Sequence, residues 1–261
     1  MGKKQSIPRN AQQKELVRLM ESIEGKYSKW EIWQDFIIMM AVSIANTFPG
    51  PHRAQREKLY QDHAAKYQAK ELDVFAHMAA EVVSALEHNP EQDVLGELFM
   101  LLGLSNEWKG QFFTPYNVCR AMAMMTFGPL LKDSLADKGW FSVNDPACGA
   151  GATLIAMANE CRRQGINYQT SVLFVAQDID FLASCMCYIQ LSLLGCAGYI
   201  VVDDSIMHPA QSYDDRALLP ASSQNVWITP MYYKDVWEER RQLASVSYTH
   251  LRAHETRGNL V

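Results

Sequence analysis

The chain has 261 residues, of which 48% are hydrophobic and 20% are charged, and its formal net charge is −5 at pH 7. This length accommodates one large domain, or a domain with a helical appendage, and the apolar content is sufficient for a core. The negative net charge excludes a general polyanion binder, so contact with nucleic acid requires a local basic patch or a partner subunit.

The N-terminal sequence, the apolar runs and the cysteine spacing together predict a cytoplasmic protein. The first residues, MGKKQSIPRN, are polar and precede no apolar stretch, so no signal peptide is expected. The apolar runs are too short or too interrupted to cross a bilayer, which predicts no membrane contact. The cysteines form no CxxC pair and have no histidine at metal-ligand spacing, which predicts reduced thiols and no metal site. They are Cys119, Cys148, Cys161, Cys185, Cys187 and Cys196.

Residues 1–110 are expected to form a helical N-terminal region. Apolar side chains recur there at helical spacing, and the two prolines of residues 48–53 separate the first of these helices from the next. The expected helices cover, in chain order, residues 30–44, 56–70, 74–86 and 95–102.

Residues 111–245 change to strands that alternate with helices, the pattern of a parallel, doubly wound sheet. Strands are expected within residues 140–145, 171–178, 198–204 and 225–228. Helices are expected over residues 115–127, 152–164 and 181–195. Residues 246–261 are expected to be non-native, because Val246–Thr256 (VSYTHLRAHET) resembles a translated sequencing adapter; the alternative is a genuine polar tail.

The segment DPACGAG lies where the first of these strands turns into a helix. Gly149 and Gly151 allow a sharp turn and bring backbone amides close to a ligand, and the following helix adds unpaired N–H groups. Neither the GxxxxGK[ST] pattern of a phosphate loop nor the GxGxxG dinucleotide pattern is present. Asp145 instead suits a cationic or amine-bearing ligand, although such a turn can also be purely structural.

Acidic residues follow the next two strands. Asp178 ends a fully apolar strand, where its carboxylate can accept hydrogen bonds from ribose hydroxyls. Asp180 can equally be the N-cap of the next helix. Of the pair Asp203 and Asp204 after the third strand, one is expected near a ligand and the other in solvent.

Three segments together resemble the N6-adenine DNA methyltransferases, above all the methylation subunit of type I restriction–modification systems and its small relatives on mobile elements. They are residues 110–125 (GQFFTPYNVCRAMAMM), 144–155 (NDPACGAGATLI) and 174–195 (FVAQDIDFLASCMCYIQLSLLG). Residues 93–115 are similar to the helical lead-in of that family. The resemblance implies an α/β fold: a Rossmann-like methyltransferase core behind an all-helical N-terminal region, with the core incomplete at the C-terminus.

The resemblance implies S-adenosyl-L-methionine as cofactor and assigns residues to it. The methionine end would contact Phe113, Thr114 and Pro115. The methionine and ribose floor would comprise Asp145, Ala147, Gly149 and Gly151. Asp178 would take the ribose hydroxyls and Asp204 would lie by the adenine. Acids and bare backbone also suit an ammonium, a sulfonium and a ribose, and Cys148 is expected to pack beneath the turn.

The catalytic motif of the family departs from its pattern here. Members place an Asn or Asp, then Pro-Pro and an aromatic residue, where they hold the flipped adenine. This chain has Thr229, Pro230, Met231 and Tyr232 at the corresponding place. Thr229 would accept from the target amine, Pro230 would supply its carbonyl, and Tyr232 would stack on the base. A threonine hydroxyl is a weaker acceptor of shorter reach than an asparagine amide.

Four interpretations follow. In the first, the chain methylates adenine N6 in DNA through a degenerate loop. In the second, it is a catalytically inactive regulatory or anti-restriction module that binds the cofactor. In the third, the TPMYY segment is a structural turn and the true catalytic loop is absent. The fourth is a protein-glutamine methylating relative. The expected partners are DNA and, for sequence recognition, a separate specificity subunit.

Overall fold

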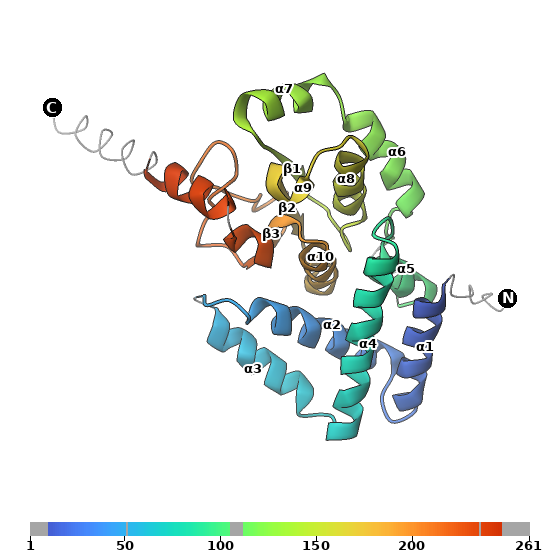
Figure 1. Cartoon of the computed structure of the whole chain (residues 1–261). Helices are drawn as coiled ribbons and strands as arrows, with labels where there is room; N and C mark the ends of the chain where they lie inside the picture. Colours follow the sequence, from blue (N-terminus) through green and yellow to red (C-terminus); the bar gives the residue numbers. More distant parts are fainter. Residues whose placement is uncertain (1–9, 51, 105–111, 235, 247–261) are drawn as a thin grey trace.

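The structure is a computed structural model that describes residues 10–50, 52–104, 112–234 and 236–246 (Figure 1). The helices are α1 (Ala11–Ile23), α2 (Lys29–Ala45), α3 (Arg53–Ala64), α4 (Ala69–His88), α5 (Val94–Leu101), α6 (Tyr116–Thr126), α7 (Pro129–Lys138), α8 (Ala152–Arg163), α9 (Tyr168–Ser171) and α10 (Phe181–Leu193). The strands are β1 (Phe141–Asp145), β2 (Val172–Asp178), β3 (Ala197–Val202) and β4 (Val226–Ile228), followed by the 3-10 helix η2 (Pro230–Tyr233) and a helix over residues 236–246. Within these ranges no helix has the length and apolar character that a membrane span requires.

Helices α2 to α5 correspond to the four helices expected in the N-terminal region, and α1 was not among those helices. Ser28 and Glu31 form a capping box that starts α2, the most deeply buried of these helices. The expectation that the next helix runs to residue 70 was wrong, because α3 ends at Ala64. A second capping box, made by Gln68 and Glu71, starts α4 only four residues later.

The sheet has the strand order β1-β2-β3-β4. Strands β1, β2 and β3 are parallel, as expected, and their carboxyl ends form one edge of the sheet, here called the carboxyl edge. Strand β4 pairs antiparallel with β3, so the expectation that all four strands are parallel was wrong. The chain in β4 therefore runs toward the opposite edge, here called the amino edge.

Alternate residues of the sheet enter two different cores, as the period of a strand requires. In β2, Phe174 and Ala176 point into the larger core, which α8 and α10 share with α1 to α5. Leu173 and Val175 point into a smaller core on the other face, which Trp237 and other residues of the C-terminal segment cover. This two-sided burial explains why β2 reads as one continuous apolar run.

The helical segment and the sheet share one continuous core. Helix α10 lies between the sheet and α2, and the lower half of Figure 1 shows α1 to α4 stacked beneath it. Trp33 and Phe36 of α2 belong to the same buried cluster as Ile155 of α8 and Ile189 of α10. The helices at the N-terminus thus form a layer of the fold.

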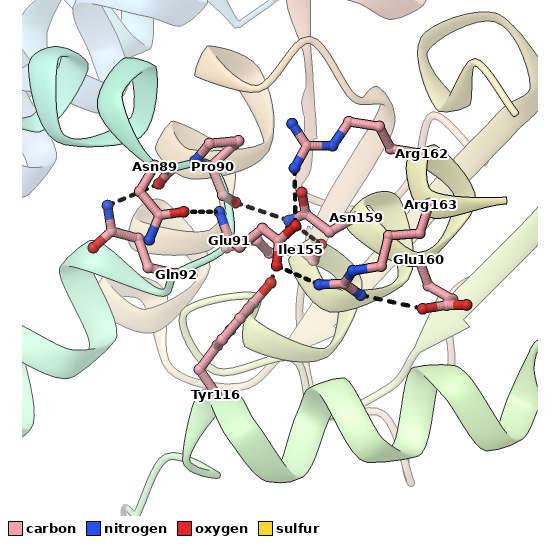
Figure 2. A network of polar contacts seen from close by, with 10 residues as sticks. All are labelled: Asn89, Pro90, Glu91, Gln92, Tyr116, Ile155, Asn159, Glu160, Arg162 and Arg163. Carbon is pink, nitrogen blue, oxygen red and sulfur yellow. Dashed lines mark hydrogen bonds and ion pairs between the residues drawn. The ribbon is translucent and has the colours of Figure 1, made fainter. Parts of the chain in front are cut away.

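Polar contacts reinforce this joint near the start of α6 (Figure 2). The buried Asn159 amide donates to the Pro90 carbonyl at 2.8 Å and to the Tyr116 hydroxyl at 3.2 Å. Glu91 forms ion pairs with Arg162 and Arg163 of α8. Because Tyr116 directly follows Pro115, this network fixes the position of the segment that precedes α6.

Candidate functional site

The turn between β1 and α8 requires glycine at two positions. Gly149 has φ = 53° and Gly151 has φ = 95°, in the left-handed region that residues with a Cβ avoid. A Cβ on Gly149 would lie 2.9 Å from the Phe113 ring, and one on Gly151 would lie 2.9 Å from the Cys187 sulfur. The bare turn therefore lets the backbone approach Phe113 on one side and α10 on the other.

Asp178 ties this turn to the end of β2. Its Oδ2 atom accepts a hydrogen bond from the Gly149 N–H at 2.8 Å, and its Oδ1 atom accepts one from the Asp180 N–H at 2.9 Å. Burial raises the pKa of the Asp178 carboxyl above its usual value. Asp180 accepts from the Ala183 N–H at 2.9 Å, which confirms it as the N-cap of α10.

Asp145 is the second carboxylate of the turn and is half-buried. Its Oδ1 atom accepts from the Ala147 N–H at 3.1 Å, and its Oδ2 atom accepts from the Thr153 hydroxyl. These bonds hold the carboxylate at the N-terminus of α8, where the first N–H groups of the helix have no intrahelical partners. Cys148 is buried beneath the turn, and its hydrogen bond with Cys187 and its burial raise the pKa of the thiol, as packing without reactivity requires.

A cavity of about 70 Å³ lies between this turn and the segment before α6. Of the residues predicted from the sequence, five line it: Phe113, Thr114, Asp145, Ala147 and Gly149. It adjoins a larger pocket of about 760 Å³, which Phe113, Thr114 and Pro115 also line. Gly151 is not among the residues that line the cavity; it is the N-cap residue of α8.

Asp93 also lines this cavity and escaped the sequence analysis. It is 2% exposed and accepts from the Gly96 N–H at 2.8 Å and from the Gln190 amide at 2.7 Å. Burial raises the pKa of its carboxyl to about 6. The same Gln190 nitrogen donates to the Ala150 carbonyl at 2.9 Å, so it joins α5 to the turn. No local pattern pointed to this contact, because Gln190 lies in a helix that also contains the polar residues Ser184 and Ser192.

Asp204 lies beyond the end of β3. The Asp203 N–H donates to the Asp178 carbonyl at 3.2 Å, so the ends of β2 and β3 are adjacent. Asp204 accepts from the N–H groups of Ile206 and Met207, and these bonds lower the pKa of its carboxyl. Ile179 and Ile206 are 71% and 88% exposed at this edge, a feature that the sequence analysis missed.

The structure does not bring Thr229, Pro230 and Tyr232 to the carboxyl edge. Because β4 is antiparallel, Thr229 lies beside the start of β3, where its hydroxyl donates to the Cys196 carbonyl at 2.7 Å and accepts from the Gly198 N–H at 3.0 Å. Thr229 is 0% exposed, and Tyr232 is 3% exposed with its hydroxyl bonded to the Leu218 carbonyl. The expected placement of this segment beside the cofactor turn was therefore wrong.

The chemistry of the carboxyl edge suits a cationic nucleoside. The carboxylates Asp93 and Asp145 line the cavity beside the glycine turn, and the exposed apolar side chain of Ile179 follows Asp178 in the chain. These groups fit the ammonium, sulfonium, ribose and adenine of S-adenosylmethionine. In the described ranges no cluster of three potential metal ligands occurs.

Two known proteins and one family model are similar to this chain. The chain is 27% identical over 167 residues to the "Type I restriction enzyme MjaIX methylase subunit" of Methanocaldococcus jannaschii, an alignment that covers 62% of this chain and about a quarter of that relative. A putative class I S-adenosylmethionine-dependent methyltransferase of Listeria monocytogenes shows 15% identity and a TM-score of 0.39, over 79% of this chain and 62% of its own. The "N-6 DNA Methylase" family model matches residues 91–259. The chain belongs to the N-6 DNA methylase family, whose cofactor is S-adenosylmethionine.

Proposed function

We propose that this chain binds S-adenosylmethionine at the carboxyl edge and takes part in the methylation of adenine N6 in DNA. The observation that carries the proposal is the hydrogen bond from the Gly149 N–H to Asp178, formed where the Phe113 ring packs against Gly149. Three segments that are far apart in the sequence meet at this one point. Each of them is a segment by which the chain resembles the family.

Each group at this edge has a defined binding role in the proposal. Asp145 and the N–H groups at the start of α8 hold the methionine end against Phe113 and Thr114. Asp178, at the end of β2, orients the ribose. Ile179 and Ile206 flank the adenine and exclude water from its faces. The cofactor supplies an electrophilic methyl group on its sulfonium, which an adenine amine can accept.

A second candidate is a module that binds the cofactor without methyl transfer. The observation that favours it is the position of Thr229, whose hydroxyl is already engaged by backbone groups of β3. Because the Thr229 hydroxyl is fully buried and already bonded to two backbone groups, it cannot accept a hydrogen bond from a target amine. The described residues therefore place no group of the TPMYY segment beside the cavity. Methylation would then need an acceptor loop from elsewhere, and the methylase relative leads us to infer a separate subunit for DNA sequence recognition.

Calorimetry with the cofactor and a tritium-transfer assay on mixed-sequence DNA together test the proposal. Asp178→Asn should weaken cofactor binding by about tenfold or more, because hydrogen bonds from the ribose hydroxyls to a charged carboxylate are stronger than those to a neutral amide. Asp180→Asn is the matched control, since asparagine is an equally good N-cap and should leave the affinity unchanged. Binding with transfer supports the first candidate, and binding without transfer supports the second. No binding by the folded chain would exclude both.

A further inference from the structure

A cleft of about 600 Å³ lies on the helical side of the sheet. One wall is α3, and the other is the segment 222–227 that leads into β4. Phe181, the first residue of α10, also lines it. We call this the α3–β4 cleft. It is separate from the cavity between Phe113 and Gly149, with which it shares no lining residue.

Arg56 gives this cleft its positive charge. Its guanidinium lies 4.4 Å from the centre of the Trp227 ring, and its Nη2 atom donates to the Val226 carbonyl at 2.9 Å. No carboxylate within the described ranges forms an ion pair with it. The side chain is half-buried, and this burial lowers the pKa of the guanidinium, with no Asp or Glu among the groups that oppose the shift. A partly desolvated arginine in this state is poised to accept an anionic partner.

The other lining groups add positive charge and polar side chains. Lys58 is exposed on the same wall, and Ser223 and Asn225 are exposed on the facing wall. Neither of these two side chains bonds to another described residue. The Trp227 indole N–H is buried beneath Arg56 with no acceptor in the described part of the chain. Asp62 is the one carboxylate in the lining, against Arg56 and Lys58, so positive charge exceeds negative charge.

A ligand that complements this cleft must be anionic and rich in acceptor oxygens. Phosphodiester groups meet both conditions, and Arg, Lys, Ser and Asn are the side chains that contact them in nucleic-acid complexes. The half-buried Phe181, whose ring centre lies 5.7 Å from that of the buried Trp227, adds an aromatic surface of the kind found beside single strands. The net charge of −5 makes such a local site necessary if the chain contacts DNA at all.

We propose that the α3–β4 cleft binds the phosphate backbone of a DNA strand, with Arg56 and Lys58 on one wall and Ser223 and Asn225 on the other. The choice of DNA over another phosphate source rests on the proposed function. The cleft would position the DNA without reading its sequence, because phosphate contacts carry no base information.

Fluorescence anisotropy with a labelled single-stranded oligonucleotide and its duplex tests this proposal on the full chain. Lys58→Glu should weaken binding about tenfold at roughly 50 mM salt and reduce the salt dependence by about one phosphate contact. Lys14→Glu is the matched control, because it makes the same charge change on the exposed face of α1, at the opposite end of the helical layer from α3 (Figure 1). It should change the affinity less than twofold. Ser223→Asp, on the facing wall, should weaken binding without touching α3.

Several outcomes would overturn the proposal. Equal affinities of Lys58→Glu, Ser223→Asp and Lys14→Glu would place any DNA contact elsewhere, and no binding by the folded wild type would remove the site. Inorganic phosphate that stabilises the wild type but not Lys58→Glu, without DNA binding, would assign the cleft to a small anion. Calorimetry with S-adenosylmethionine on the same variants separates the two claims, because Lys58→Glu should retain full cofactor affinity.

Discussion

Gly149 and Gly165 adopt similar left-handed backbone angles, with φ = 53° and φ = 75°, but they have different surroundings. A Cβ at Gly149 would meet the Phe113 ring, whereas one at Gly165 would meet nothing within 4 Å. Gly165→Ala should therefore cost only the backbone strain, about 1–2 kcal/mol of unfolding free energy. Gly149→Ala should add the clash and also displace Phe113 from the cofactor cavity.

Urea denaturation and calorimetry on the two glycine variants check this prediction. Gly149→Ala should lose cofactor affinity by about tenfold or more, which corresponds to about 1.4 kcal/mol or more of binding free energy. Gly165→Ala should bind as the wild type does. Equal cofactor affinity in both variants would mean that the turn is structural and does not hold the ligand.

Asp93 gives the chain a defined pH dependence of stability. Its carboxyl has a pKa of about 6 in the fold, because of burial, against 3.8 for an unperturbed aspartate. Below about pH 4 the group is protonated in both states, so its stabilising contribution is fully present. As the pH rises through 6, that contribution is lost, and the loss approaches about 3 kcal/mol. An asparagine at position 93 cannot ionise, so it causes no such loss of unfolding free energy as the pH rises.

The unfolding free energies of wild type and Asp93→Asn, measured in urea between pH 4 and pH 7.5, test this prediction. The variant should gain stability relative to the wild type as the pH rises, with most of the gain between pH 4 and about pH 6.5. Comparing the two proteins removes the titration of the other carboxyls. A difference that stays constant with pH would show that Asp93 titrates normally in the fold.

At the scale of the element, helices α2 to α5 and strands β1 to β3 followed from periodicity in the sequence, whereas α1 was not predicted. The apolar residues of α2 and of β2 face the cores, and their spacing can be recognised within a short stretch of sequence. Helix α7 was missed, because Pro129–Lys138 combines few apolar residues with several polar ones. The direction of β4 was also missed, since three residues pair through long-range contacts that no local pattern encodes.

The candidate site likewise contains residues that the sequence predicted and residues that it did not. Gly149, Asp145 and Asp178 were predictable, because strand ends of a parallel sheet meet at one edge. Asp93 was not, because an aspartate before a helix indicates an N-cap and nothing in its neighbours reveals the contact with Gln190. Thr229 was misplaced, because its distance along the chain from Asp145 matches the family, whereas its position in space depends on how β4 pairs.

Thr229 is expected to stabilise the joint between β3 and β4. Thr229→Val keeps the shape but removes the hydroxyl, which leaves the Gly198 N–H and the Cys196 carbonyl without this partner. The expected cost is about 1–3 kcal/mol of unfolding free energy, and cofactor affinity should not change. Thr229→Ser keeps the hydroxyl and is the control. Loss of methyl transfer in Thr229→Val at wild-type stability would instead support a catalytic threonine.

For the whole molecule, the shared core predicts that the helical layer and the sheet unfold together. Trp33 lies in the core of the helical layer and Trp237 in the core on the far face of the sheet, and both are fully buried. In fluorotryptophan-labelled protein, the fluorine resonances of the two residues should disappear at the same urea concentration. Two separate midpoints would show that the helices form an independent domain.

We expect the segments around Phe113, Gly149 and Asp178 to form one S-adenosylmethionine site at the carboxyl edge. A crystal structure of the chain grown with S-adenosylhomocysteine, which lacks only the transferred methyl group, would show where the nucleoside binds. Density is expected over the Gly149 turn, with the ribose within hydrogen-bond distance of Asp178 and the amino acid end against Phe113. Density for the nucleoside at any other place, or no density at saturating concentration in an intact fold, would mean that these segments do not form the site.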